Sequence, residues 1–225
     1  MELQQLFRTL MDHHGPQEWW PARTRFEMVA GAILVQNTRW SQAARAVDVL
    51  EQRGWLEPGT LAAAPLSELA AAVRPAGFYR RKAPALKAFA RWLVDAGGFE
   101  NLSALDTAPL RRLLLDREGI GPETADCILV YAFGRPVFIA DSYARRLLNR
   151  TGVLGDRTGR AGYEAVRSFC ESRLPGSASL MNEFHALIVA HSKHPCGREP
   201  RCAGCVLAAG CATGRRLTGR RNSCR

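Results

Sequence analysis

The chain has 225 residues, enough for one large or two small domains, and its net charge is +10 with a pI near 9.8. This charge favours a polyanionic partner, nucleic acid first. No apolar run reaches the length of a bilayer span, and the first residues show neither the basic nor the apolar region of a signal peptide. We therefore expect a soluble, cytoplasmic (nucleoid-associated) monomer with no membrane partner.

The spacing of apolar residues predicts helices along nearly the whole chain. An amphipathic helix is expected around residues 3–10, and a buried helix follows at 26–35. Further helices are expected at 41–53, 66–74, 82–96, 108–117, 122–133, 142–151, 160–173 and 178–193. No segment alternates apolar and polar residues like a strand, so the fold class is all-α. The break at 134–136 (Gly-Arg-Pro) is the best candidate for a lobe boundary.

A helical hairpin is expected where Gly119, Ile120 and Gly121 follow one helix and Pro122 opens the next at its first position. The two glycines let the backbone approach a ligand closely, while Ile120 can anchor the turn in the core. Free amides at the start of the second helix suit a phosphate group. An ordinary αα-hairpin has the same pattern. Combined with the positive charge, the turn is interpreted as a DNA-backbone site.

Four cysteines near the C-terminus have the spacing C-x5-C-x2-C-x5-C: Cys196, Cys202, Cys205 and Cys211. Four thiolates within sixteen residues favour one metal centre rather than a hydrophobic core. A 4Fe–4S cluster is the first choice. Zinc is second, because zinc ligands more often come as two short cysteine pairs and only the middle pair has that form. The other cysteines are scattered and their total is odd, which indicates a reduced protein: Cys127, Cys170 and Cys224.

Histidines and arginines surround the cysteine segment. His191 and His194 precede Cys196 and are alternative metal ligands, although four cysteines suffice and His194 is expected at the surface. His185 lies in an apolar helix and is expected to be an ordinary core histidine. The last twelve residues, GRRLTGRRNSCR, carry five arginines and no acid. Such a tail is typical of a solvated, disordered segment, but beside a metal-bound loop it could add phosphate contacts.

Together these features resemble the helix-hairpin-helix DNA glycosylases of the endonuclease III superfamily, over roughly residues 20–211. The resemblance implies a six-helix barrel with the hairpin at 22–134. It also implies a second lobe, made of 1–21 and 135–225, that holds the cluster, with a DNA-binding cleft between the lobes. A catalytic aspartate follows the hairpin in this superfamily, and Asp141, after Val137-Phe-Ile-Ala140, matches that position. The first cysteine gap is one residue shorter here than in the family.

Glu123 stands where the bifunctional members of this superfamily carry a lysine that forms a Schiff base with the sugar. A carboxylate cannot form that bond. The resemblance therefore implies a monofunctional enzyme that uses water as nucleophile. Glu123 also suits a helix N-terminus as an ordinary acid. If it lies near Asp141, repulsion between the two carboxylates would raise one pKa and help hold a proton in the site.

Four separated segments resemble the 3-methyladenine DNA glycosylase III branch: 19–21 (Trp-Trp-Pro), 36–40 (Gln-Asn-Thr-Arg-Trp), 73–79 and 119–126. This resemblance implies a base pocket lined by Trp19, Trp20 and Trp40, whose faces attract a cationic alkylated purine. Gln36 resembles the residue that fills the gap left by the flipped nucleotide. The adenine-specific branch is disfavoured, because Ala32 stands where that branch has a glutamate. The expected partner is double-stranded DNA that contains damaged bases.

Simpler explanations exist for the same residues. Trp19 and Trp20 could form a hydrophobic clasp at a helix start, Gln36 could be a buried capping residue, and Asp141 could be an N-cap. Two other functions also stay open: a glycosylase for oxidised or mismatched pyrimidines, and a non-catalytic protein that binds damaged DNA.

Overall fold

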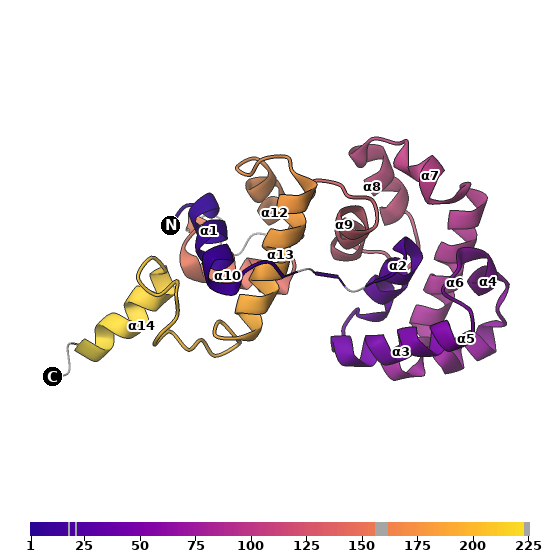
Figure 1. The fold of residues 1–225 in the computed structure, drawn as a ribbon, viewed down its shortest axis with the longest axis horizontal. Coiled ribbons are helices and arrows are strands. Elements are labelled where there is room, and N and C mark those ends of the chain that lie inside the picture. The colour runs from indigo at the N-terminus through magenta and orange to yellow at the C-terminus, as the bar shows by residue number, and fades with distance from the viewer. Residues whose placement is uncertain (18, 21, 156–161, 223–225) are drawn as a thin grey trace. The chain divides into compact units, whose positions relative to one another are not determined.

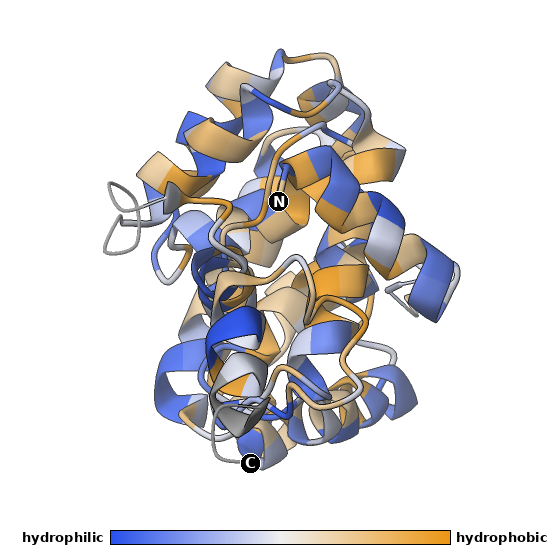
Figure 2. Cartoon of the chain, turned by 90° about the vertical axis from the view of Figure 1, so that its left-hand side faces the viewer, coloured by the Kyte–Doolittle hydropathy of each residue, from blue (hydrophilic) through white to orange (hydrophobic). Residues whose placement is uncertain are grey.

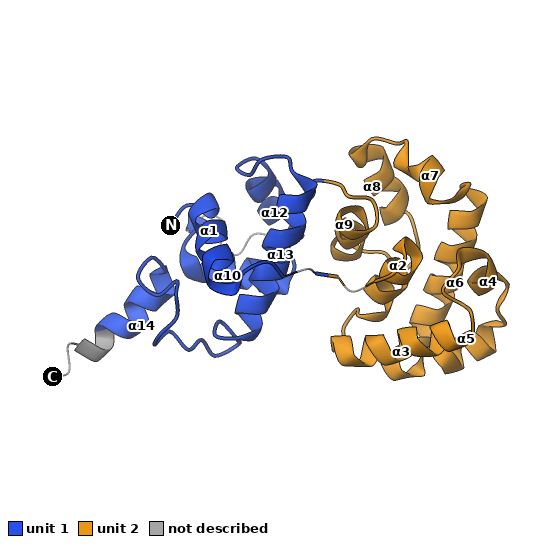
Figure 3. Cartoon of the chain, viewed as in Figure 1, with its two compact units in different colours: residues 1–19, 136–225 blue, residues 20–135 orange. Residues whose placement is uncertain are grey.

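The computed structural model describes residues 1–17, 19–20, 22–155 and 162–222, and these form helices and connecting segments with no strand among them. The all-α prediction is confirmed. The chain divides into two compact units (Figures 1 and 3). We call Trp20–Arg135 the central unit, and Met1–Trp19 together with Pro136–Arg225 the terminal unit. No helix among the described residues is both long and apolar enough to cross a bilayer.

The central unit is built around α2, Arg25–Leu34, whose residues from Met28 to Leu34 are all buried. The side chain of Thr24 caps this helix by accepting the amide of Glu27. Helices α3, α6 and α9 pack against α2, which explains why it is apolar on every side. The remaining elements, in chain order, are α3 Trp40–Gln52, α4 Pro58–Ala63, α5 Leu66–Ala72, the 3₁₀ turn η1 Arg74–Ala76, α6 Tyr79–Asp95, α7 Gly98–Ser103, α8 Thr107–Leu115 and α9 Pro122–Tyr131.

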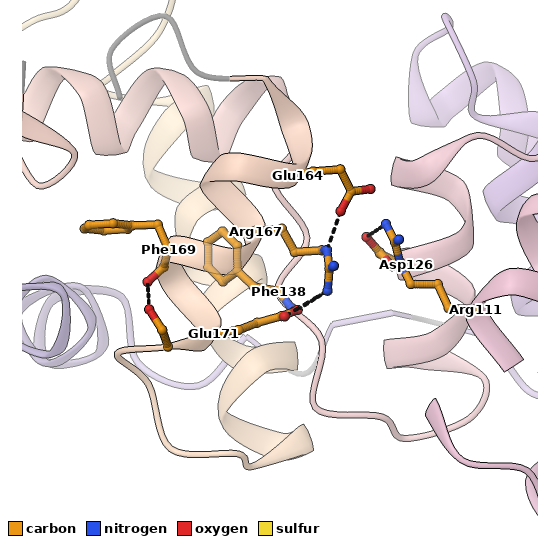
Figure 4. Close-up of polar contacts among 8 residues, drawn as sticks. Arg111, Asp126, Phe138, Glu164, Arg167, Phe169 and Glu171 are labelled. Atoms are coloured by element: carbon orange, nitrogen blue, oxygen red, sulfur yellow. Dashed lines mark hydrogen bonds and ion pairs between the residues drawn. The ribbon is translucent and has the colours of Figure 1, made fainter. Parts of the chain in front are cut away.

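An ion pair joins the two helices of the central unit's hairpin. Arg111 of α8 donates from Nε to Oδ1 of Asp126 on α9 at 2.7 Å and from a terminal nitrogen to Oδ2 at 3.1 Å (Figure 4). Asp126 is fully buried. A buried carboxylate needs such a two-pronged partner to offset its lost hydration. The pair therefore holds α8 and α9 together on the two sides of the hairpin turn.

The terminal unit packs α13, the longest of its helices, against α1 and α10, and α14 rests on α10. Its helices are α1 Leu3–His14, α10 Ser142–Thr151, α12 Tyr163–Glu171, α13 Ala178–Lys193 and α14 Ala212–Asn222. Most of these helices carry polar and apolar residues on the same turn (Figure 2), as expected when one face packs inward. Arg167 holds Glu164 and Glu171 on α12, and Glu171 accepts the amide of Phe138 (Figure 4).

Three helices were not predicted from the sequence. Pro58-Gly59 is a dipeptide typical of turns, but here the proline occupies the first position of α4. Gly97 and Gly98 have φ of 78° and 86°, and they form the N-cap and the first residue of α7 rather than end all helical structure. The expectation of a disordered tail was wrong for α14. The expected helix at 160–173 begins at Tyr163 among the described residues; residues 160 and 161 lie outside them, as do Pro21 and Cys224.

Candidate active site and cysteine loop

The hairpin turn between α8 and α9 depends on a glycine at its first position. Gly119 has φ of 80°, and a Cβ placed on it would lie 2.8 Å from the Cβ of Ala85, so only glycine fits there. Ile120 is 5% exposed and anchors the turn. Gly119 and Gly121 lie at the surface on either side of it. The turn therefore presents its backbone just before the start of α9.

Gln36, expected to fill the gap in the duplex, is bound to this hairpin. Its Nε2 donates to the carbonyl oxygen of Gly119 and to Oγ1 of Thr124, both at 2.9 Å. The structure thus brings Gln36 and the hairpin glycines together. In this arrangement the amide helps to hold the turn in place.

A hollow of about 230 Å³ lies beside these residues, and its lining includes Phe78, Arg80 and Arg81. Phe78 is 62% exposed and has φ of 48°, an unusual combination for a large apolar residue. Lys82 links α6 to α2 and η1: it is 4% exposed, and its Nζ donates to the carbonyl oxygens of Leu34 and Ala76. Burial lowers the pKa of Lys82. The exposure of Phe78 was not predicted from the sequence. The feature that could have indicated it is an aromatic residue directly after a glycine, Gly77.

Trp20 and Trp40 pack edge to face, with ring centroids 5.0 Å apart. Gly31 of α2 makes room for them, because a Cβ there would lie 3.3 Å from the Trp20 ring and 3.5 Å from the Trp40 ring. Tyr131, which the sequence did not single out, adds a third ring 5.3 Å from Trp20. Trp40 is 37% exposed, so the cluster opens to solvent.

Trp19 belongs to the terminal unit. Lys193 places its Nζ 5.0 Å from the centre of the Trp19 ring. The indole Nε1 of Trp19 is buried and has no hydrogen-bond partner among the described residues. Its proposed place in a base pocket stays a prediction.

Asp141 is the N-cap of α10 and is only 7% exposed. Its Oδ1 accepts the amide of Ala144 at 2.7 Å, while Oδ2 lies 3.4 Å from Nε2 of His185. His185 is buried, as expected for a core histidine, and it contacts the predicted catalytic carboxylate. Glu123 lies exposed in the first turn of α9, in the other unit, so its coupling to Asp141 stays a prediction.

The four cysteines lie in the segment between α13 and α14. Cys196 and Cys211 are buried, and the middle two are half-buried. Burial raises the pKa of Cys202 and of Cys205, and the charges of the other loop cysteines add to both shifts. The four thiols are therefore close enough to interact electrostatically.

Arginines of α10 hold the start of this segment. Arg150 donates to Sγ of Cys196 at 3.4 Å and to the carbonyl oxygen of Arg198 at 2.7 Å. Arg146 donates to the carbonyl oxygen of Ser192 at 3.0 Å. Among the described residues, no three histidine, cysteine or acidic side chains are placed as ligands of one ion. By its chemistry, a set of four soft sulfur donors, of which Cys196 accepts a hydrogen bond from Arg150, fits an iron–sulfur cluster.

His191, considered above as an alternative ligand, is fully buried on α13. Its Nδ1 lies 3.1 Å from Nε2 of His14, and its Nε2 lies 3.5 Å from Sγ of Cys205. Burial and the neighbouring histidines lower the pKa of His191 to about 4. His194 is exposed, as expected, beside Arg201.

Comparison with known proteins gives one consistent family. The description "HhH-GPD superfamily base excision DNA repair protein" matches residues 30–175. A protein of Methanocaldococcus jannaschii with the provisional name DNA repair glycosylase is 38% identical over 209 residues, covering 92% of this chain and 94% of its own. Endonuclease III of Sulfolobus acidocaldarius is 30% identical, covering 84% and 82%.

A solved structure is similar over most of the chain. It is 3-methyladenine DNA glycosylase of H. pylori bound to 1,N6-ethenoadenine, with a TM-score of 0.74 and 28% identity. The match covers 86% of this chain and 98% of that one.

Proposed function

The chain belongs to the HhH-GPD superfamily of base excision DNA repair proteins, and we propose that it hydrolyses the N-glycosidic bond of alkylated purines such as 3-methyladenine. That it is a base excision repair glycosylase follows from the family. The finer assignment rests mainly on one observation: the half-open cluster of Trp20, Trp40 and Tyr131 around Gly31. The likeness to the H. pylori enzyme supports the same substrate class.

Electron-rich rings suit this substrate because 3-methyladenine carries a positive charge while it is bonded to the sugar of DNA. A base that already carries a positive charge is a good leaving group, so the enzyme mainly has to flip the nucleotide, stack the base and stabilise the sugar. Each well-placed ring contributes about 0.5–2 kcal/mol of cation–π attraction.

Asp141 is proposed as the catalytic carboxylate. In the reaction its negative charge would stabilise the oxocarbenium-like sugar, and it would orient and deprotonate the attacking water. The amide of Ala144 and the ring of His185 hold the two carboxylate oxygens in fixed directions. This support matters because small errors in the position of a catalytic group are costly.

DNA is proposed to bind along the central unit's hairpin. Its turn offers backbone amides, the neighbouring hollow carries Arg80 and Arg81, and Phe78 projects beside them. An exposed apolar ring among cations is suited to stack on bases that are unpaired by flipping. The net charge of +10 adds the long-range attraction.

Base release from methylated duplex DNA tests the substrate class. We expect free 3-methyladenine from the wild-type protein, separated by chromatography. Trp40→Leu should lower the release rate by roughly 2- to 30-fold, the equivalent of one cation–π contact. It should change the release of a neutral purine such as hypoxanthine far less.

The matched control is Trp55→Leu, which removes an indole that Arg53 covers elsewhere in the central unit. If Trp40→Leu lowers the release rates of cationic and neutral bases equally, cation–π attraction does not explain the effect of Trp40. No release of any purine would contradict the alkylation proposal and leave a pyrimidine glycosylase, or a protein that only binds damage, to be tested.

We also propose that the enzyme is monofunctional, because Glu123 occupies the first turn of α9 where a Schiff-base lysine would be needed. Borohydride reduction during turnover should therefore trap no covalent protein–DNA complex. The abasic product should remain uncut until it is treated with alkali. A trapped complex would show that an amine of the chain attacks the sugar. In that case Lys82, whose pKa burial lowers, is the first residue to replace.

The cysteine loop is proposed to hold a 4Fe–4S cluster through Cys196, Cys202, Cys205 and Cys211, with zinc as the second choice. The cluster would be structural. It would order a loop whose exposed arginines, Arg198 and Arg201, reach the DNA backbone.

A further inference from the structure

Three side chains from distant parts of the sequence form a contact chain in the terminal unit. His14, at the end of α1, lies 3.1 Å from His191 on α13, and His191 lies 3.5 Å from the sulfur of Cys205. The middle member is fully buried, whereas His14 is partly exposed. A buried imidazole with both nitrogens in contact has a defined orientation.

The chemistry of a coordinated sulfur fixes the direction of these hydrogen bonds. A cysteine that binds a cluster is a thiolate, which only accepts. Nε2 of His191 must therefore carry the proton and donate to Cys205. A neutral imidazole has a single N–H, so Nδ1 of His191 is left as an acceptor. His14 then donates from its Nε2.

We propose that His191 is a positioning residue for the cluster, donating its Nε2–H to the Cys205 thiolate, and that His14 holds it in the required tautomer. The proposal rests on the cluster assigned above to the cysteine loop. Its consequence is a reduction potential raised by the histidine pair. It assigns a role to His14, which no motif in the sequence marked.

The expected direction of the shift follows from charge. A cluster that gains an electron becomes more negative, and its thiolate sulfurs share that charge. A hydrogen bond to a sulfur therefore stabilises the reduced form more than the oxidised form, which raises the potential. Partners of metal ligands have this tuning role in other metal sites.

The histidine contact is made to Cys205, one of the two middle cysteines of the loop. Cys196 has a different donor, the guanidinium of Arg150 at 3.4 Å. His194 lies exposed beside Arg201 rather than against a thiol. His13 is exposed and contacts only the edge of His14 among the described ring contacts. These differences supply internal controls.

The test is a potentiometric titration of the purified holoprotein, followed by electron paramagnetic resonance, after iron and sulfide have been counted. His191→Leu should lower the reduction potential, and His191→Gln should recover part of the loss because its amide can donate. His14→Leu should lower it by less, and His14→Gln should restore it by donating to Nδ1. His13→Gln should match the wild type.

Equal potentials in the wild type, His14→Leu and His191→Leu would overturn the proposal. So would loss of iron from His191→Leu with a changed iron-to-sulfide ratio, which would make His191 a ligand. If His191→Leu does not fold, the reduction potentials of His14→Leu and His14→Gln test the proposal, because His14 is partly exposed and its replacement should be tolerated. A wild-type protein without iron would overturn both this proposal and the cluster, whereas base release would still test the glycosylase.

Discussion

Asp141→Asn is expected to lower the rate of base release by roughly 10²–10⁴-fold, the usual contribution of a positioned acid–base group. The substitution removes the charge that would stabilise the developing sugar cation and activate water. It leaves an oxygen that can still accept the amide of Ala144, and asparagine caps helices about as well as aspartate. Stability should therefore change little. The measurement is single-turnover release of methylated purines.

Two controls separate catalysis from folding and binding. Asp106→Asn changes an exposed aspartate at the N-cap of α8 and should leave the rate unchanged. Asp141→Ala should lose the cap as well, at a cost of about 1 kcal/mol in unfolding free energy. Affinity for DNA with a non-hydrolysable abasic analogue should be retained in Asp141→Asn. A variant that releases bases within a few-fold of the wild type would mean that another group activates the water.

Much of the fold could be predicted because its helices are amphipathic or uniformly buried, and both patterns are visible in one sequence. The long helices α3, α10 and α13 appeared within a residue or so of their expected ends. The short helices were missed because they begin at glycine and proline, which locally signal turns equally well. The start of α6 was missed for a related reason: the helix follows Phe78, which has a positive φ, and it contains Pro84.

The site was only partly predictable because several of its contacts join residues far apart in the sequence. Asp141 was predicted as the catalytic carboxylate from its position after the hairpin, but nothing local indicates that His185 would lie against it. Tyr131 looked like one more helical residue until the fold brought it to Trp20. Exposure is equally non-local: the sequence around Phe78 does not reveal that its ring is 62% exposed.

The second large expected effect is the loss of metal on replacing a cysteine of the loop. Cys202→Ala should remove most of the bound iron and acid-labile sulfide, because it deletes one of four ligands at the half-buried side of the loop. A bound metal centre contributes its binding free energy to folding, so the midpoint of thermal unfolding should fall. Affinity for DNA should also fall as the loop arginines lose their fixed positions.

The salt dependence of DNA binding counts the phosphate contacts that the loop arginines would make. If Arg198 and Arg201 each contact a phosphate when the loop is ordered, the slope of log affinity against log salt should decrease by about two in Cys202→Ala. Cys127→Ser is the matched control, since Cys127 lies on α9 of the central unit, away from the loop in sequence. Zinc in place of iron would favour the second choice of metal. Full iron content in Cys202→Ala would exclude this residue from the ligand set and leave the short Cys202–Cys205 pair without its proposed role.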